Sequence, residues 1–142
     1  LNGNDCFASK GFIYSRVKLN NIYIDIYNTH LDAGISKKDQ LVRSKQLSKL
    51  KQYIYKKSLG KNIIVCGDFN INYLDKNRSL INSLCDSLKL NFVQWNENYF
   101  LEYKIDYIFY SKNFNFFNES IPDTLFYLSD HPPMQAYFEI IE

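Results

Sequence analysis

Apolar and polar residues alternate in the first part of the chain. In residues 22–28 isoleucine occupies positions 22, 24 and 26, and tyrosine or aspartate occupies positions 23, 25 and 27. This period of two predicts a strand with one buried face. Residues 11–18 also read as a strand, and the pair Asn20-Asn21 separates the two segments. Because asparagine tolerates the backbone of a tight turn, the sequence predicts a β-hairpin here.

Two later segments carry apolar residues at helical spacing. Ser36 followed three residues later by Asp39 is the pattern of a capping box, which predicts the start of a helix. Apolar residues then recur every three or four positions until Gly60, a residue that commonly ends helices. A leucine at every fourth position predicts a second helix near residues 78–89.

Shorter apolar runs predict three more strands, at residues 62–66, 105–110 and 134–140. Because strands alternate with two helices, we predict an α/β layered domain. No repeat or Pro/Gly-rich hinge divides the chain, so residues 1–142 are predicted to form a single unit. The segment FNFF at 114–117 is interpreted as a half-buried edge strand with Phe114 and Phe116 on one face. The alternative is an apolar element that dips into a membrane surface.

The composition limits the class of protein. With 46% hydrophobic and 17% aromatic residues, the chain is too apolar to be disordered. No apolar run approaches the roughly 20 residues that a membrane-spanning helix requires. No signal peptide is visible, and a chain that begins at Leu1 rather than Met leaves room for an upstream segment. Three cysteines without metal-ligand spacing are interpreted as reduced core residues, which favours an intracellular location.

The charge is small but uneven. A net charge of +2 does not by itself indicate a nucleic-acid partner. Nine of the 17 Lys and Arg residues lie between Lys37 and Lys61, where Asp39 is the single acid. The preferred interpretation is the solvated face of a helix. The alternative is a surface that meets phosphate groups of a membrane or a nucleic acid.

Polar residues cluster at four predicted strand ends. The clusters are Asn28-Thr29-His30, Gly67-Asp68-Phe69-Asn70, Asp106, and Ser129-Asp130-His131. Each alone has an ordinary explanation: a hydrogen-bonded histidine, an Asx turn, or loop polarity. Together they are more informative, because the chain has two histidines and both lie beside a strand end near carboxylates.

Hydrolysis of a phosphodiester needs an activated water and neutralisation of charge on the phosphoryl oxygens. Carboxylates such as Asp68 and Asp130 suit Mg²⁺, with Mn²⁺ as the alternative. Histidines oriented by carboxylates suit proton transfer, which contributes about 10²–10⁴-fold in rate. The clusters therefore favour metal-dependent hydrolysis of a phosphoester.

Four motifs in order carry a family resemblance: NTHLDAG (28–34), GDFN (67–70), KIDYIFYS (104–111) and SDHPP (129–133). They closely resemble the endonuclease/exonuclease/phosphatase superfamily, which has the deoxyribonuclease-like fold. The resemblance implies the second half of a four-layer α/β/β/α sandwich, with a mainly antiparallel or mixed sheet and two main helices.

The resemblance also implies roles for the residues at the strand ends. Asp68 would ligate the metal or activate the attacking water, and Asn70 would hold the phosphate or that water. Asp130 would bind metal, directly or through water. His30 would donate a hydrogen bond to the phosphoryl oxygen in the transition state.

The resemblance also implies that Asp106 and His131 act as a pair. Asp106 would hydrogen-bond His131 and fix its tautomer. Whether the general base is Asp68 or the Asp106–His131 pair stays open.

In the family, an earlier half of the domain supplies an Asn and a Glu that complete the metal site. Nothing in this sequence matches that half. Either the chain is a fragment of a longer protein, with the missing N-terminal half as its partner, or it has lost the metal-binding Glu. One half alone would leave an apolar sheet face uncovered. We therefore expect the chain alone to be a poor catalyst.

Two further stretches bear on the substrate. Residues 5–17, which include Lys10, resemble the segment before the first histidine strand of neutral sphingomyelinases. Residues 39–54 resemble their Arg-x-x-Gln-Leu helix, here with Arg43. Lys10 and Arg43 in these stretches, together with Asn28 of the NTHLDAG motif, are predicted to bind substrate, and a membrane sphingolipid is the preferred one. A nuclease, an inositol-phosphate phosphatase and a binding module without catalysis are the alternatives.

Overall fold

The computed structural model describes residues 10–72, 78–95, 104–122 and 129–141. Within them the strands and helices follow in the order β1 (Phe12–Leu19), β2 (Ile22–His30), α1 (Lys37–Ser58), β3 (Asn62–Asp68), α2 (Ser79–Leu88), β4 (Leu90–Phe92), β5 (Asp106–Ser111), β6 (Phe114–Ser120) and β7 (Gln135–Ile140).

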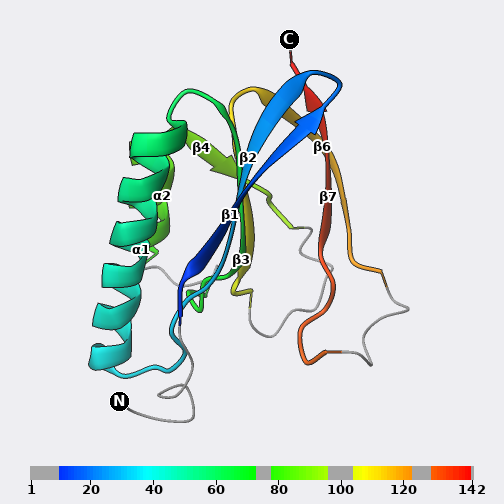
Figure 1. Ribbon diagram of the computed structural model, residues 1–142. Helices are drawn as coiled ribbons and strands as arrows, with labels where there is room; N and C mark the ends of the chain where they lie inside the picture. Colours follow the sequence, from blue (N-terminus) through cyan, green and yellow to red (C-terminus); the bar gives the residue numbers. More distant parts are fainter. Residues whose placement is uncertain (1–9, 73–77, 96–103, 123–128, 142) are drawn as a thin grey trace.

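A five-stranded mixed sheet has the strand order β1-β2-β3-β5-β4. Strands β2 and β3 run parallel, and the other neighbours in this sheet are antiparallel. Both helices lie on one side of the sheet, and the β6–β7 ribbon lies on the other (Figure 1). The predicted α/β class, with a mixed sheet and two helices, is confirmed.

The β1–β2 hairpin forms as predicted. Asn20 and Asn21 both have positive φ, 46° and 70°, which is the backbone of the two-residue turns that match strand twist. Strand β4 was not predicted, because three residues are too few to show an alternation.

Helix α1 begins at the predicted capping box. The Asp39 backbone N–H donates to Ser36 Oγ, and the Ser36 backbone N–H donates to the Asp39 carboxylate. Residues at helical spacing on α1, including Leu50 and Ile54, are fully buried against the sheet. The main core therefore lies between the helices and one face of the sheet.

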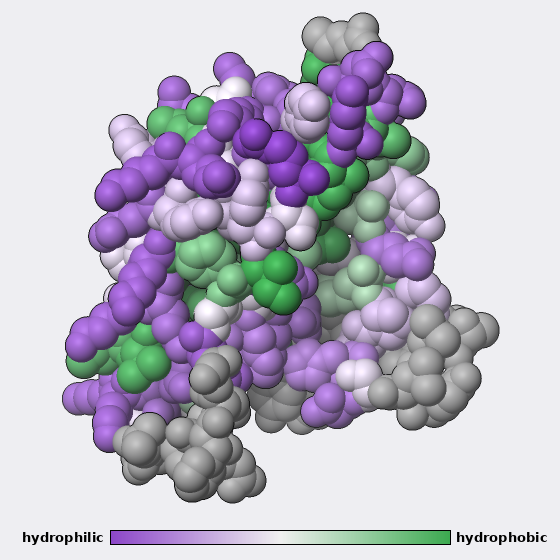
Figure 2. Space-filling view, viewed as in Figure 1, coloured by the Kyte–Doolittle hydropathy of each residue, from purple (hydrophilic) through white to green (hydrophobic). Residues whose placement is uncertain are grey.

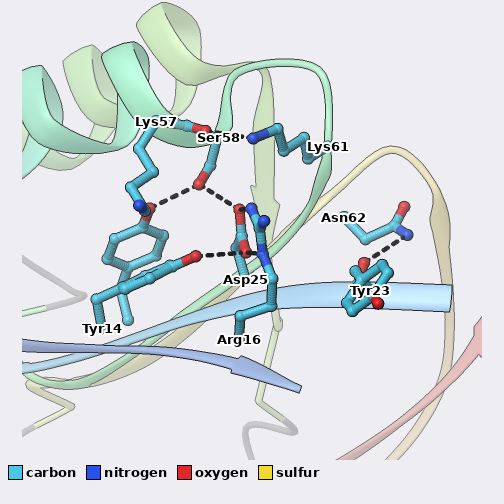
Figure 3. Close-up of polar contacts among 9 residues, drawn as sticks. Tyr14, Arg16, Tyr23, Asp25, Lys57, Ser58, Lys61 and Asn62 are labelled. Carbon is cyan, nitrogen blue, oxygen red and sulfur yellow. Dashed lines mark hydrogen bonds and ion pairs between the residues drawn. The ribbon is translucent and has the colours of Figure 1, made fainter. Parts of the chain in front are cut away.

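A buried carboxylate joins β1, β2 and the end of α1 (Figure 3). Asp25 on β2 is 1% exposed and accepts two hydrogen bonds from the Arg16 guanidinium, at 2.6 and 2.9 Å. Ser58, the last residue of α1, donates to Asp25 at 2.5 Å, and Tyr14 donates at 3.0 Å. A buried charge that is paired and hydrogen-bonded in this way fixes the elements that supply its partners.

The FNFF segment belongs to β6. Phe114 is buried, and Phe114 and Phe116 both contact Phe138 on β7, so they share one face as predicted. Among the helices of the described residues, none is long and apolar enough to cross a bilayer.

The face of β1 that points away from the helices is apolar and open. Ile13, Val17 and Leu19 lie on it and are 69%, 43% and 52% exposed. Figure 2 shows hydrophilic side chains along α1 and hydrophobic ones gathered between α1 and β7. The structure thus has the uncovered apolar sheet face that the sequence predicts.

The hydrogen-bonded Asp25 carboxylate makes the stability of the fold depend on pH in the acidic range. Burial alone would raise the pKa of Asp25, but hydrogen bonds from Arg16, Ser58 and Tyr14 lower the pKa to about 2, from 3.8. The carboxylate therefore stabilises the fold fully above pH 4, and this stabilisation, about 2 kcal/mol, is lost as the pH falls towards 2.

We expect Asp25→Asn to lower the free energy of unfolding at pH 7 by about 2 kcal/mol or more. The same variant should lose less further stability than the unaltered chain between pH 4 and pH 2.5. Urea unfolding at several pH values measures both. Asp86→Asn, which changes an exposed carboxylate on α2, is the control, and equal pH profiles for all three proteins would contradict the prediction.

Candidate active site

Three neighbouring strands place polar residues in one row across the sheet. In the strand register His30 on β2 pairs with Asp68 on β3, and Asp68 pairs with Asp106 on β5. Because side chains alternate along strands, these three lie on the face opposite the buried residues Tyr27 and Val65. The row therefore lies on the face that the helices do not cover.

His131 joins this row from the segment before β7. Its Nδ1 atom lies 2.8 Å from Asp106 Oδ2, which forms the predicted pair. Partial burial would lower the pKa of His131, but the hydrogen bond to Asp106 and the charges of Asp106, Asp68 and Asp130 raise it. With Nδ1 engaged, Nε2 is the ring nitrogen that remains for a substrate or a water.

Asp68 lies between the two histidines. His30 Nε2 is 3.4 Å from Asp68 Oδ2, and the Asn70 backbone N–H donates to Asp68 Oδ1 at 2.7 Å. Burial is the main cause that raises the pKa of Asp68, and the nearby Asp106 charge raises it further. The Asn70 hydrogen bond and the two histidines act in the opposite direction.

Asn70 links the ends of β2 and β3. Its side-chain amide donates to the Leu31 carbonyl at 3.1 Å, and its φ of 49° lies in the left-handed region that asparagine tolerates. The next residue, Ile71, accepts a hydrogen bond from the Tyr107 hydroxyl at 2.9 Å. Sequence reasoning missed Tyr107, although a tyrosine on the buried face of a strand signals a hydroxyl that needs a partner.

Arg43 and Gln46 on α1 hold the loop that follows His30. Arg43 Nη1 donates to the Asp32 and Gly34 carbonyls at 2.9 and 2.7 Å, and Arg43 is 6% exposed. Gln46 Oε1 accepts from the Asp32 backbone N–H at 2.9 Å. The structure thus gives Arg43 a supporting position behind this loop, and its role in binding substrate stays a prediction.

The other predicted residues lie around the row. Asn28 is exposed, on the same face as His30, and its amide lies 3.5 Å from Cys66 Sγ. Lys10 is half-buried just before β1, and Asp130 is exposed beside His131. Their roles in binding substrate or metal stay predictions.

The three cysteines were predicted to be reduced core residues, and the structure describes two of them. Cys66 and Cys85 are free and half-buried, so they are less buried than core residues. Cys6 lies outside the described residues.

Asp68, Asp106 and His131 offer ligand atoms that all lie within 4.8 Å of one another. Two carboxylates at this spacing fit a hard cation such as Mg²⁺, which binds oxygen ligands and keeps several waters. A cation there would also offset the repulsion between the two carboxylates. Asp130 is not part of this group, so its role as a metal ligand stays a prediction.

Comparisons with known proteins extend this picture. The family described as endonuclease/exonuclease/phosphatase family 2 matches residues 2–104. A sphingomyelinase of Mycobacterium tuberculosis is 33% identical over 79 residues, which cover 55% of this chain and 15% of that protein. The chain therefore spans a small part of this relative.

Two solved structures share the fold. An endonuclease/exonuclease/phosphatase from Beutenbergia cavernae superimposes with a TM-score of 0.77 at 15% identity, over 93% of this chain and 40% of that one. A Staphylococcus aureus beta toxin variant with bound magnesium ions gives a TM-score of 0.67 at 20% identity, over 95% of this chain and 60% of that one. The deoxyribonuclease-like fold predicted from the motifs is confirmed.

Gly67, one residue before Asp68, lies too close to the backbone of β2 for any side chain to fit. A Cβ there would lie 1.9 Å from the Thr29 carbonyl oxygen, and its φ is 129°. Gly60 also has a positive φ, 82°, but a Cβ there would meet nothing within 4 Å. Gly60→Ala thus isolates the backbone strain, and Gly67→Ala adds the clash.

We expect Gly60→Ala to cost about 1–2 kcal/mol of unfolding free energy. Gly67→Ala should lower the free energy of unfolding by more than about 3 kcal/mol, a loss that most substitutions do not reach. The reason is that β2 and β3 would have to separate next to His30 and Asp68. Chemical unfolding monitored by circular dichroism measures both. Equal losses would show that the close approach to Thr29 is not a constraint.

Proposed function

Because this chain belongs to the endonuclease/exonuclease/phosphatase family, we propose that it forms part of a Mg²⁺-dependent phosphodiesterase with sphingomyelin as its substrate. The products would be ceramide and phosphocholine. The observation that supports the reaction most is the row of His30, Asp68 and Asp106 with His131 bonded to Asp106. The observation that supports the substrate is the 33% identity to a sphingomyelinase.

The Asp106–His131 pair is suited to moving a proton. Asp106 fixes the orientation of the imidazole through Nδ1, so Nε2 can take a proton from water or give one to the leaving oxygen. The raised pKa of His131 keeps the protonated form populated closer to neutral pH. Protonated His131 would then act as the general acid, and neutral His131 as the general base.

His30 and Asn28 would hold the phosphoryl group. Both lie on the uncovered face of β2, and the His30 imidazole is more than half exposed. Its Nε2–H can donate to Asp68 or to a phosphoryl oxygen on which negative charge grows in the transition state. This arrangement would favour the transition state over the substrate.

Asp68 and Asp106 would hold the metal ion, with waters completing its shell. When bound, Mg²⁺ would supply charge neutralisation on the phosphate and a more acidic water. Burial of Asp68 and the nearby charge of Asp106 both raise the pKa of Asp68. Two carboxylates in this arrangement would be more stable with a bound cation than without one.

A separate observation concerns the rest of the domain. The chain spans 40% and 60% of the two solved structures, and its β1 face exposes Ile13, Val17 and Leu19. We propose that a further segment of the same domain covers this face and completes the metal site. The chain alone would then turn over slowly and tend to associate through the open face.

The decisive experiment measures binding and turnover of sphingomyelin vesicles, plasmid DNA and an inositol phosphate, with Mg²⁺ or EDTA. The 142-residue chain is tested beside any longer parent polypeptide. We expect Mg²⁺-dependent release of phosphocholine, reduced about 10²–10⁴-fold by His131→Ala. Asp68→Asn should abolish the response to Mg²⁺, and Asp86→Asn, the same chemical change on α2, should leave activity unchanged.

The other outcomes separate the alternatives. DNA nicking with the same dependence on Mg²⁺ and His131 would keep the chemistry and overturn the lipid substrate. Release of phosphate from an inositol phosphate would favour a phosphatase. A parent polypeptide that binds these substrates and turns over none of them would identify a binding module.

A further inference from the structure

A cavity of about 310 Å³ opens at the end of the sheet remote from the candidate active site. Apolar side chains of Leu59, Ile63 and Leu88 line it, and three lysines, Lys61, Lys89 and Lys112, stand around it. Within the described part of the chain no acidic residue lines it. Apolar walls with a few polar groups of one kind are typical of small-ligand pockets, and this volume lies at their lower limit.

The strands separate this cavity from the row of Asp68 and Asp106. Ile63 precedes Asp68 by five residues on β3, a distance of about 17 Å at the rise of a strand. Strand β5 runs in the opposite direction, so Asp106 begins it at the active-site end and Ser111 ends it at the cavity. The cavity is therefore distinct from the site described above.

The walls of the cavity are held by hydrogen bonds within the fold. The backbone N–H of Ile63 donates to Ser111 Oγ at 3.0 Å, and the Asn113 amide donates to Asn62 Oδ1 at 2.8 Å. Ile63 and Leu88 are 1% and 2% exposed, so the floor belongs to the packed core. A ligand would meet a preformed surface and would not have to order a loop on binding.

The negative ends of the helices do not account for all three lysines around the cavity. Lys61 Nζ donates to the Lys57 carbonyl at 2.6 Å and so offsets the negative end of α1. Lys112 follows a strand, where no helix dipole calls for a cation. The backbone N–H of Lys89 donates to the Cys85 carbonyl at the end of α2. The side-chain ammonium groups of Lys89 and Lys112 have no hydrogen bond or ion pair with a described residue, so both are available to an anion.

Lys89 also has an unusual backbone. It ends α2 with a φ of 55°, at a position where glycine or asparagine is preferred. The other non-glycine residues with positive φ in the described part are all asparagines. A lysine held in this strained conformation at the mouth of a cavity points to a use for its ammonium group.

We propose that this cavity binds a small amphiphilic anion with one carboxylate and one short alkyl chain. The alkyl chain would lie against Leu59, Ile63 and Leu88, and the carboxylate would meet Lys89 and Lys112. The absence of acids from the described lining leaves the positive charge uncompensated, which favours an anion over a neutral chain. The small volume favours a single short chain over a two-chain lipid.

The test is a titration of the full 142-residue chain, labelled with ¹⁵N, with decanoate below its micelle-forming concentration. We expect saturable shifts of the amide resonances of residues 59–63, 88–89 and 111–113. Acetate and 1-decanol, which carry the charge or the chain alone, should bind at least about fivefold more weakly. Lys89→Gln/Lys112→Gln should weaken decanoate about fivefold to tenfold, as expected for the loss of two exposed ion pairs.

Lys45→Gln/Lys49→Gln removes the same charge from the exposed side of α1 and should leave the affinity unchanged. Leu59→Asp, at a side chain that is 39% exposed, keeps the core intact and should abolish binding by adding a negative charge. Equal binding by the two lysine variants, equal binding of 1-decanol, or shifts centred on Ile13 and Val17 would overturn the proposal. None of these outcomes depends on phosphodiesterase activity.

Discussion

The parallel pairing of β2 and β3 is the constraint on which the site depends. Its register sets His30 beside Asp68, and a parallel pair requires a crossover, which α1 supplies. The crossover is fastened twice: Ser58 binds Asp25 at one end of α1, and Arg43 binds the loop after His30 near the other. Helix α1, which helps to cover the core, therefore also positions the loop next to the candidate site.

Local signals in the sequence predicted most of the fold. The Asn20-Asn21 turn, the capping box of α1 and the period of β2 each depend on residues near one another in the chain. Strand β4 escaped prediction because three residues form a strand only when β5 lies beside them. The pairing of Asp106 with His131 was predicted from the resemblance of the motif order to a known family. Periodicity alone does not indicate it.

Tertiary contacts decided the rest of the site. An arginine on a helix has the same sequence signature whether it faces solvent, a substrate or a backbone carbonyl, so the position of Arg43 required the structure. Tyr107 reads as a core aromatic until its hydroxyl is seen at the Ile71 carbonyl. The lysine-rimmed cavity is built by three segments far apart in the chain, and no local pattern indicates it.

The contacts of the site also span long distances along the chain. Asn70 reaches Leu31 across 39 positions, and His131 reaches Asp106 across 25. Closing such loops costs entropy before any contact repays it, so these contacts form late relative to the hairpin and helices. A nascent chain that has paired β2 with β3 holds His30 opposite Asp68 while His131 still lacks its carboxylate. The four side chains of the candidate site therefore come together only once folding is complete.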